Sequence, residues 1–254
     1  MPHSRRSLLC IPLPPLPDVR PGDDLAGMLA AAAPEDLAAD DVLVVAHKVV
    51  SKSEGRIRRL AQIEPGERAR ALAAEHGKDA RHVQAVLDES TKLLRARDGV
   101  LICVTRHGLV CANAGVDLSN VSGDGEVVLL PEDPDASARR LRGGMELALG
   151  VRPAVVIGDS FGRAWRMGQT DVAIGAAGLA PLDEWRGRPD AYGRELRVTE
   201  IAIADAVAGA ADLARAKDSR EPAVLVRGLG RFVTVADGPG AAALRRPRDR
   251  DLFR

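Results

Sequence analysis

Short apolar runs along this chain predict the strands of a buried sheet. Runs of four or five residues rich in Val, Ile and Ala, without alternation, are typical of strands covered on both faces. Strands are predicted at residues 7–13, 42–46, 125–131, 154–157 and 223–226, and a hairpin at residues 99–112. The hairpin turns at Arg106, His107 and Gly108.

Between these runs, apolar positions recur with the spacing of helices. Helices are predicted at residues 24–39, 65–76, 81–89, 134–149 and 198–215. Asp23 or Asp24 can cap the first of them, and Pro65 and Gly77 are usual boundary residues for the second. The chain therefore mixes strands and helices, and it shows no internal repeat.

The densest polar cluster follows the apolar run at residues 154–157. Gly158 ends this run, and Asp159 and Ser160 come next, where a strand would hold their hard oxygen atoms at its junction with a loop. The polar residues Arg163, Arg166, Gln169, Thr170 and Asp171 follow before the next apolar run begins at Val172. This pattern predicts a pocket for a charged ligand, and a surface turn in which Asp and Ser cap a helix is the alternative.

Two other segments carry candidate ligands. Lys48 and Lys52 follow the strand at 42–46, where they can meet phosphates or lie solvated at the surface. The loop at residues 113–121 contains Asp117 and Asn120 and is either a metal or phosphate loop or an Asx-turn.

Composition excludes several classes of protein. The 254 residues carry 36 basic and 36 acidic side chains, which favours neither nucleic acid nor an anionic membrane as a partner. Three cysteines without CxxC spacing indicate reduced thiols and no zinc site. No signal peptide or membrane-spanning run is predicted, so we expect a soluble cytoplasmic protein.

Common nucleotide and hydrolase motifs are missing from the sequence. It contains no GxxxxGK[ST], no GxGxxG after a strand, no GxSxG and no HExxH. A nucleotide would therefore bind outside the P-loop and Rossmann arrangements.

Five blocks in order resemble the coenzyme F420-0:L-glutamate ligase family, the gamma-glutamyl ligases of the deazaflavin coenzyme F420. The blocks are LPDVRPGDDL (16–25), DVLVVAHKVVSKSEGR (41–56), RHGLVCANAGVDLSNV (106–121), GDSFGRAWRMGQTDVAIGAAGL (158–179) and AVLVRGL (223–229). The resemblance extends from about residue 8 to about residue 232.

The resemblance implies an activity and a fold. Members use GTP and magnesium or manganese, at two cation sites, and potassium is a further candidate cation. They join the amino group of L-glutamate to a carboxyl on the phospholactate arm of F420-0, then add further glutamate by gamma-linkage. The implied fold is a family-specific α+β arrangement without a P-loop, in an intertwined homodimer. One domain would cover residues 1–240, with a flexible tail at 241–254.

The resemblance also implies roles for individual residues. Asp117, Asp159 and Ser160 would bind the cations, and Lys52, Asp117 and Asp159 would be catalytic. The implied nucleotide contacts are Leu16, Pro17, Asp18, Val19, His47, Lys48, Lys52, Asn120, Lys217, Asp218 and Ser219. Segment 215–222 would close over the nucleotide, and Arg163 and Arg166 could pair with a phosphate or carboxylate of the substrates.

Three positions depart from the family pattern. His47 stands where relatives carry a small polar residue, Ser160 where they often have Thr, and Lys217 where some have Gln. A lysine is a poor cation ligand, so Lys217 is expected to contact the nucleotide. These departures leave open a related GTP-dependent ligase for another acid and amine, and a non-catalytic nucleotide-binding protein is a further alternative.

Overall fold

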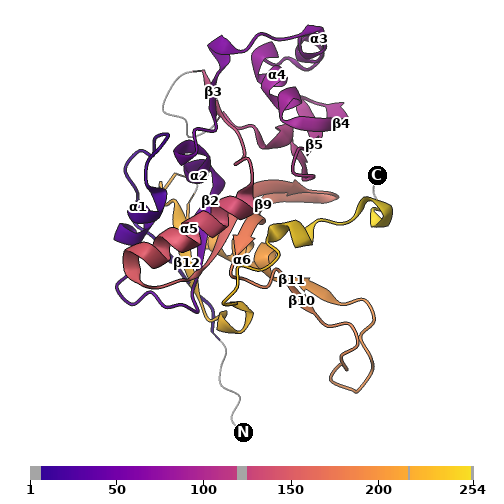
Figure 1. Ribbon diagram of the computed structural model, residues 1–254. Coiled ribbons are helices and arrows are strands. Elements are labelled where there is room, and N and C mark those ends of the chain that lie inside the picture. The colour runs from indigo at the N-terminus through magenta and orange to yellow at the C-terminus, as the bar shows by residue number, and fades with distance from the viewer. Residues whose placement is uncertain (1–6, 119–124, 217, 253–254) are drawn as a thin grey trace.

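A five-stranded sheet forms the centre of the protein (Figure 1). The computed structural model describes residues 7–118, 125–216 and 218–252. The strands lie in the order β1 (Leu9–Pro12), β12 (Ala223–Arg227), β2 (Val42–Ala46), β8 (Ala154–Arg163) and β9 (Arg166–Ala177). β2 and β8 are parallel, whereas the other neighbours are antiparallel. Together with the helices, this sheet confirms a mixed α+β fold.

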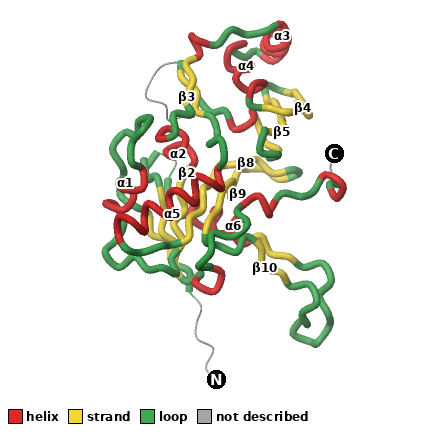
Figure 2. Tube along the Cα trace, viewed as in Figure 1, coloured by secondary structure: helices red, strands yellow, loops and turns green. Residues whose placement is uncertain are grey.

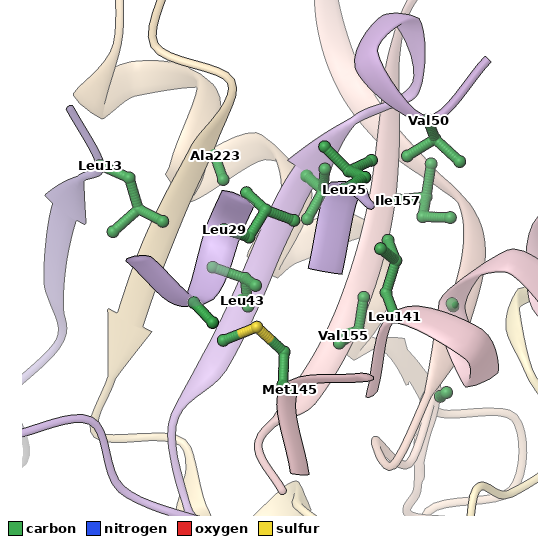
Figure 3. Packing of buried hydrophobic residues seen from close by; sticks show 14 of the residues in the cluster. Leu13, Leu25, Leu29, Leu43, Val50, Leu141, Met145, Val155, Ile157 and Ala223 are labelled. Carbon is green, nitrogen blue, oxygen red and sulfur yellow. The ribbon is translucent and has the colours of Figure 1, made fainter. Parts of the chain in front are cut away.

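Helices cover both faces of this sheet, which explains the continuous apolar runs. On one face α1 (Leu25–Ala32) and α5 (Pro134–Leu149) pack against alternate residues of β2 and β8. Figure 3 shows Leu29 and Met145 beside Leu43 in this core. On the other face α6 (Ile203–Ala214) packs against the intervening residues. Side chains on both faces of β2 and β8 are therefore buried, as expected for strands whose sequence is continuously apolar.

Two helices end or begin where the sequence did not predict. α1 stops at Ala32, because Ala33 precedes Pro34 and has the extended backbone that proline favours (φ −71°, ψ 148°). α6 begins at Ile203, since residues 200–202 form β11. By contrast, α5 matches its prediction of residues 134–149: Asp133 caps it by accepting from the Ala136 N–H at 2.9 Å.

A second lobe has its own core. It contains α3 (Glu67–His76), α4 (Ala80–Asp88), β4 (Ser90–Arg97), β5 (Val100–Thr105) and β6 (Val110–Ala112). The predicted hairpin is β5 and β6, but the sequence analysis missed β4, which pairs with β5. β3 (Ile57–Arg59) and β7 (Glu126–Val128) form a two-stranded ladder between this lobe and the main sheet.

A two-stranded arm projects from the opposite end (Figure 2). It consists of β10 (Leu182–Glu184) and β11 (Glu200–Ala202), with a polar loop between them.

The C-terminal segment is tied to α5 by Asp135. The carboxylate of this buried residue accepts from the N–H groups of Ala241 and Ala242 at 2.7 and 3.1 Å. Ala241 is itself buried, whereas residues 248–250 are exposed. The division between a domain at 1–240 and a tail at 241–254 stays a prediction. In the part of the chain that the structure describes, no helix has the length and apolar content to cross a membrane.

Candidate functional site

The parallel strands β2 and β8 bring His47 and Asp159 together at the edge of the sheet where β2 ends, at the carboxyl end of that strand. Ala46 and Gly158 are partners in the ladder, and the two residues follow them directly. His47 Nε2 lies 3.2 Å from Asp159 Oδ1. His47 is only 2% exposed, and its Nε2 atom is not aligned for a hydrogen bond within the described residues. The imidazole is therefore wedged against the carboxylate at ion-pair distance.

Asp159 and Ser160 lie inside a strand, and the prediction that they open into a loop was wrong. β8 continues to Arg163, and it pairs there with β9 beyond the end of β2. Because side chains alternate along a strand, these neighbours point to opposite faces. Asp159 contacts His47, whereas Ser160 Oγ donates to Asp171 Oδ1 at 2.5 Å.

Asp117 reaches the same edge from a distant part of the chain. Its N–H and C=O groups pair with Val128 at 3.0 and 2.9 Å, which extends the ladder of β7. Its Oδ2 atom lies 2.7 Å from Lys48 Nζ. Since Lys48 follows His47 at the start of α2 (His47–Ser53), the two aspartates contact consecutive residues. The structure therefore brings Asp117 and Asp159 to one end of α2.

Lys52 lies four residues beyond Lys48, on the same side of α2. Its Nζ atom is 3.4 Å from Asp18 Oδ1. Beside this pair is a cleft of about 580 Å³, lined among others by Asp18, Val19, Lys52 and Glu126. In the same segment Leu16 packs partly against the main core, and Pro17 is exposed. Of the predicted nucleotide contacts in this segment, Asp18 and Val19 thus line the cleft with Lys52, whereas Leu16 and Pro17 do not.

Segment 215–222 lies between α6 and β12 in the chain, and its last residue reaches the same edge. The carbonyl of Pro222 accepts from the Ala46 N–H at 2.9 Å, immediately before His47. Asp218 is exposed, and Ser219 Oγ donates to the carbonyl of Ala216 at 2.8 Å. Two predicted nucleotide contacts, Asn120 and Lys217, lie outside the described residues.

Several polar residues near this edge were not assigned a role from the sequence. Asp171 is 1% exposed and pairs with the guanidinium of Arg215 as well as with Ser160. Arg59 also lines the cleft and lies 3.2 Å from Glu126 Oε1. An acidic residue just before an apolar strand run was the available signal for Asp171. Its partner could not be read from the local pattern, because Arg215 is 44 residues away.

The predicted substrate partners Arg163 and Arg166 lie at the exposed tip of the ribbon formed by β8 and β9. The Nη2 atom of Arg163 donates to the carbonyl of Met167 at 2.9 Å. The pairing of these arginines with a substrate stays a prediction.

The thiol of Cys111 on β6 lies close enough to Asp159 for the charge of that carboxylate to affect its pKa. Burial, and then the nearby Asp159 carboxylate, raise the pKa of the Cys111 thiol to about 12. Because the thiolate is the reactive form, iodoacetamide at about pH 8.5 should leave Cys111 unmodified in the folded protein. Peptide mass spectrometry would measure this, with protein unfolded in guanidinium as the control. Rapid alkylation of folded protein would contradict the burial.

The donor atoms at this edge suit a hard divalent cation. Asp117 and Asp159 offer carboxylate oxygens and Ser160 a hydroxyl, which are ligands that Mg²⁺ and Mn²⁺ accept. Among the residues described, no group of three or more His, Cys, Asp and Glu side chains forms a ready metal site. Magnesium often binds through one or two carboxylates together with substrate phosphates and water. The residues therefore fit a cation that binds together with a nucleotide.

Comparison with known proteins gives one consistent result. The F420-0:Gamma-glutamyl ligase family matches residues 15–228. A coenzyme F420:L-glutamate ligase of Methanopyrus kandleri is 46% identical over 245 residues, which is 96% of either chain. The protein of the same name from Methanothermobacter thermautotrophicus is 42% identical over 243 residues, 94% of this chain and 96% of its own. One from Archaeoglobus fulgidus is 42% identical over 245 residues, covering 96% and 95%. The matched region contains both aspartates, α2 and the cleft, and the chain belongs to the F420-0:Gamma-glutamyl ligase family.

Proposed function

We propose that this protein is a GTP-dependent ligase that adds L-glutamate to coenzyme F420-0 and then extends it by gamma-linked glutamate. One observation carries the proposal: His47 and Lys48, consecutive residues of α2, contact Asp159 and Asp117, and Lys52 of the same helix lines a cleft. Family membership supports the choice of F420-0 as the acid substrate and L-glutamate as the amine substrate, since the relatives named above are coenzyme F420:L-glutamate ligases.

The first step activates the acid substrate. A carboxylate oxygen of F420-0 attacks the γ-phosphorus of GTP, the bond from that phosphorus to the bridging oxygen breaks, and GDP leaves. The product is an acyl phosphate. Phosphoryl transfer of this kind depends on alignment and on neutralising charge. Lys48 and Lys52, one helical turn apart on α2, would supply two positive charges along the phosphates.

The second step forms the amide bond. The glutamate ammonium gives up one proton, and its nitrogen attacks the acyl carbon. Inorganic phosphate leaves with one oxygen from the original carboxylate, and the nitrogen loses a second proton. Binding the amine beside the acyl phosphate, away from bulk water, would favour amide formation over hydrolysis. We assign no residue as the base.

Asp117, Asp159 and Ser160 would hold magnesium or manganese, at two sites. Such a cation would supply positive charge to neutralise the phosphates that these residues face. Asp159 and Ser160 leave opposite faces of the ribbon, which favours two separate sites over one shared site. Potassium as a further cation, a homodimer and a cytoplasmic location stay predictions of the sequence.

Replacing Lys52 by methionine should weaken GTP binding more than it slows turnover. The variant keeps the apolar stem and removes the charge, and a hydrogen bond to a charged group contributes about 1.5–3 kcal/mol. We therefore expect KM for GTP to rise about 10- to 100-fold. Steady-state kinetics would measure this, with Lys92→Met on the exposed side of β4 as the control. An unchanged KM would remove Lys52 from the nucleotide site.

A single reaction distinguishes the proposed substrates from their alternatives. The protein is incubated with GTP, Mn²⁺, L-glutamate and F420-0, and the coenzyme is weighed by mass spectrometry. We expect a gain of one or more glutamyl units and an equal amount of GDP. GTP turnover only with another acid and amine would favour the related ligase that His47 and Ser160 leave open. A protein that binds no GTP would exclude both enzymes.

A further inference from the structure

A buried ion pair, formed by Asp171 and Arg215, lies next to the predicted cation ligand Ser160. Asp171 is 1% exposed, and the side chain of Arg215 is 10% exposed. One carboxylate oxygen of Asp171 pairs with the Arg215 guanidinium, and the other accepts from Ser160 Oγ at 2.5 Å. A carboxylate removed from water to this extent needs such partners, and loss of one leaves the other charge buried without compensation.

This pair joins two elements that are distant in sequence. Asp171 lies on β9, directly opposite Ser160 on β8. Arg215 is the first residue after α6, where it has left the helical conformation (φ −119°, ψ 151°). The pair therefore links the strand that carries Ser160 to the start of segment 215–222.

The far end of segment 215–222 is also fixed. Pro222 accepts the hydrogen bond from Ala46 described above, so the segment ends next to His47. Within residues 218–222 the backbone turns, with Arg220 in the left-handed region at φ 56°. The described residues on either side of position 217 thus begin at the Ser160 side of the sheet and end beside His47. It carries two of the predicted nucleotide contacts, Asp218 and Ser219.

We infer that Asp171 and Arg215 are positioning residues of the nucleotide and cation site. Asp171 orients the Ser160 hydroxyl with one oxygen and anchors the start of segment 215–222 with the other. The shape of the segment over the nucleotide and the direction of a cation ligand then depend on a single carboxylate. Neither residue needs to touch a substrate. This inference rests on the proposed function.

Asp171→Asn tests the pair, because it keeps the side-chain volume and removes the charge. Two quantities are measured: hydrogen exchange of the backbone amides in segment 215–222, and the Kd for the GTP analogue GMP-PNP with Mg²⁺. We expect faster exchange than in the wild type and a Kd raised about 10- to 100-fold, the usual cost of losing a partner that orients a ligand. Arg215→Lys should retain more affinity than Arg215→Met, because it keeps the charge.

Asp41→Asn is the matched control. Asp41 is 4% exposed and lies 3.2 Å from Arg227 Nε, but it precedes β2, at the end of the strand opposite His47. It should lower stability without changing the Kd. Unchanged exchange in Asp171→Asn would overturn the anchor, and unchanged Kd would overturn its role in the site. Equal losses in both variants would also overturn it, as an effect of stability alone. A wild type that does not bind GMP-PNP would refute the proposed function, while the exchange result would still decide the anchor.

Discussion

Asp159→Asn should abolish ligase turnover and leave the fold intact. The substitution keeps the side-chain volume in a strand that β9 still pairs, so circular dichroism and the melting temperature should change little. It removes the carboxylate that lies 3.2 Å from His47 and that would hold a cation. Losing one fixed group that stabilises the transition state commonly costs about 10²–10³-fold in kcat. We expect at least that loss in the rate of GDP formation.

Asp183→Asn provides the control for this variant. The side chains of Asp183 and Asp159 are both 15% exposed, and Asp183 also lies on a strand, in the β10–β11 arm. Its activity should match the wild type. Wild-type activity in Asp159→Asn itself would remove the cation assignment.

Arg142→Met should cause the largest loss of stability. Arg142 is 2% exposed, and its guanidinium donates to the carbonyls of Pro153, Thr234 and Val235 and to Asp237 Oδ1 at 2.6–3.1 Å. These bonds hold the segment of residues 234–237 against α5. The Asp237 side chain is 30% exposed, so the main loss is of hydrogen bonds to the carbonyls: each buried acceptor left unpaired typically costs about 1–3 kcal/mol, or about 3–5 kcal/mol in total here. For a chain of this length we expect the melting temperature to fall by roughly 10 °C.

Differential scanning calorimetry would measure this fall, with Arg97→Met as the matched control. Arg97 also pairs with an aspartate, Asp98, but both side chains are exposed, and such pairs contribute about 0–1 kcal/mol. Its melting temperature should stay within about 3 °C of the wild type. Equal melting temperatures for the two variants would show that the buried guanidinium is not a main stabilising group.

Much of the central sheet could be predicted from the sequence. The stretches 42–46 of β2, 154–157 of β8 and 223–226 of β12 are apolar throughout because helices cover both faces of the sheet there, so burial appears directly in the local pattern. The bounds of α5 were equally predictable, since a capping aspartate and a proline mark its amino end and a glycine marks its carboxyl end.

Other elements had no comparable local signal. α2 begins directly after β2 at Ala46, without a capping side chain, so the sequence analysis did not predict this helix. The outer half of the β8–β9 ribbon is polar, and strand pairing holds it extended without an apolar pattern. The site itself depends on long-range pairs such as Lys48 with Asp117, which no local spacing encodes. Its residues were named through the family resemblance, and their chemical roles stay predictions.

Transfer of oxygen from F420-0 to phosphate tests the central claim most directly. If GTP activates the acid as an acyl phosphate, the phosphate that leaves carries one oxygen from the F420-0 carboxyl group. The reaction is run with F420-0 labelled with ¹⁸O in that carboxyl group, together with GTP, Mn²⁺ and L-glutamate, and the phosphate is weighed by mass spectrometry. We predict one ¹⁸O atom in the phosphate formed by the first coupling, and none in the phosphate formed when a later glutamate is added, because that step activates the unlabelled gamma-carboxyl of the first glutamate. Labelled phosphate should therefore equal the amount of F420-0 that gained at least one glutamate, and amide product without labelled phosphate would contradict the account.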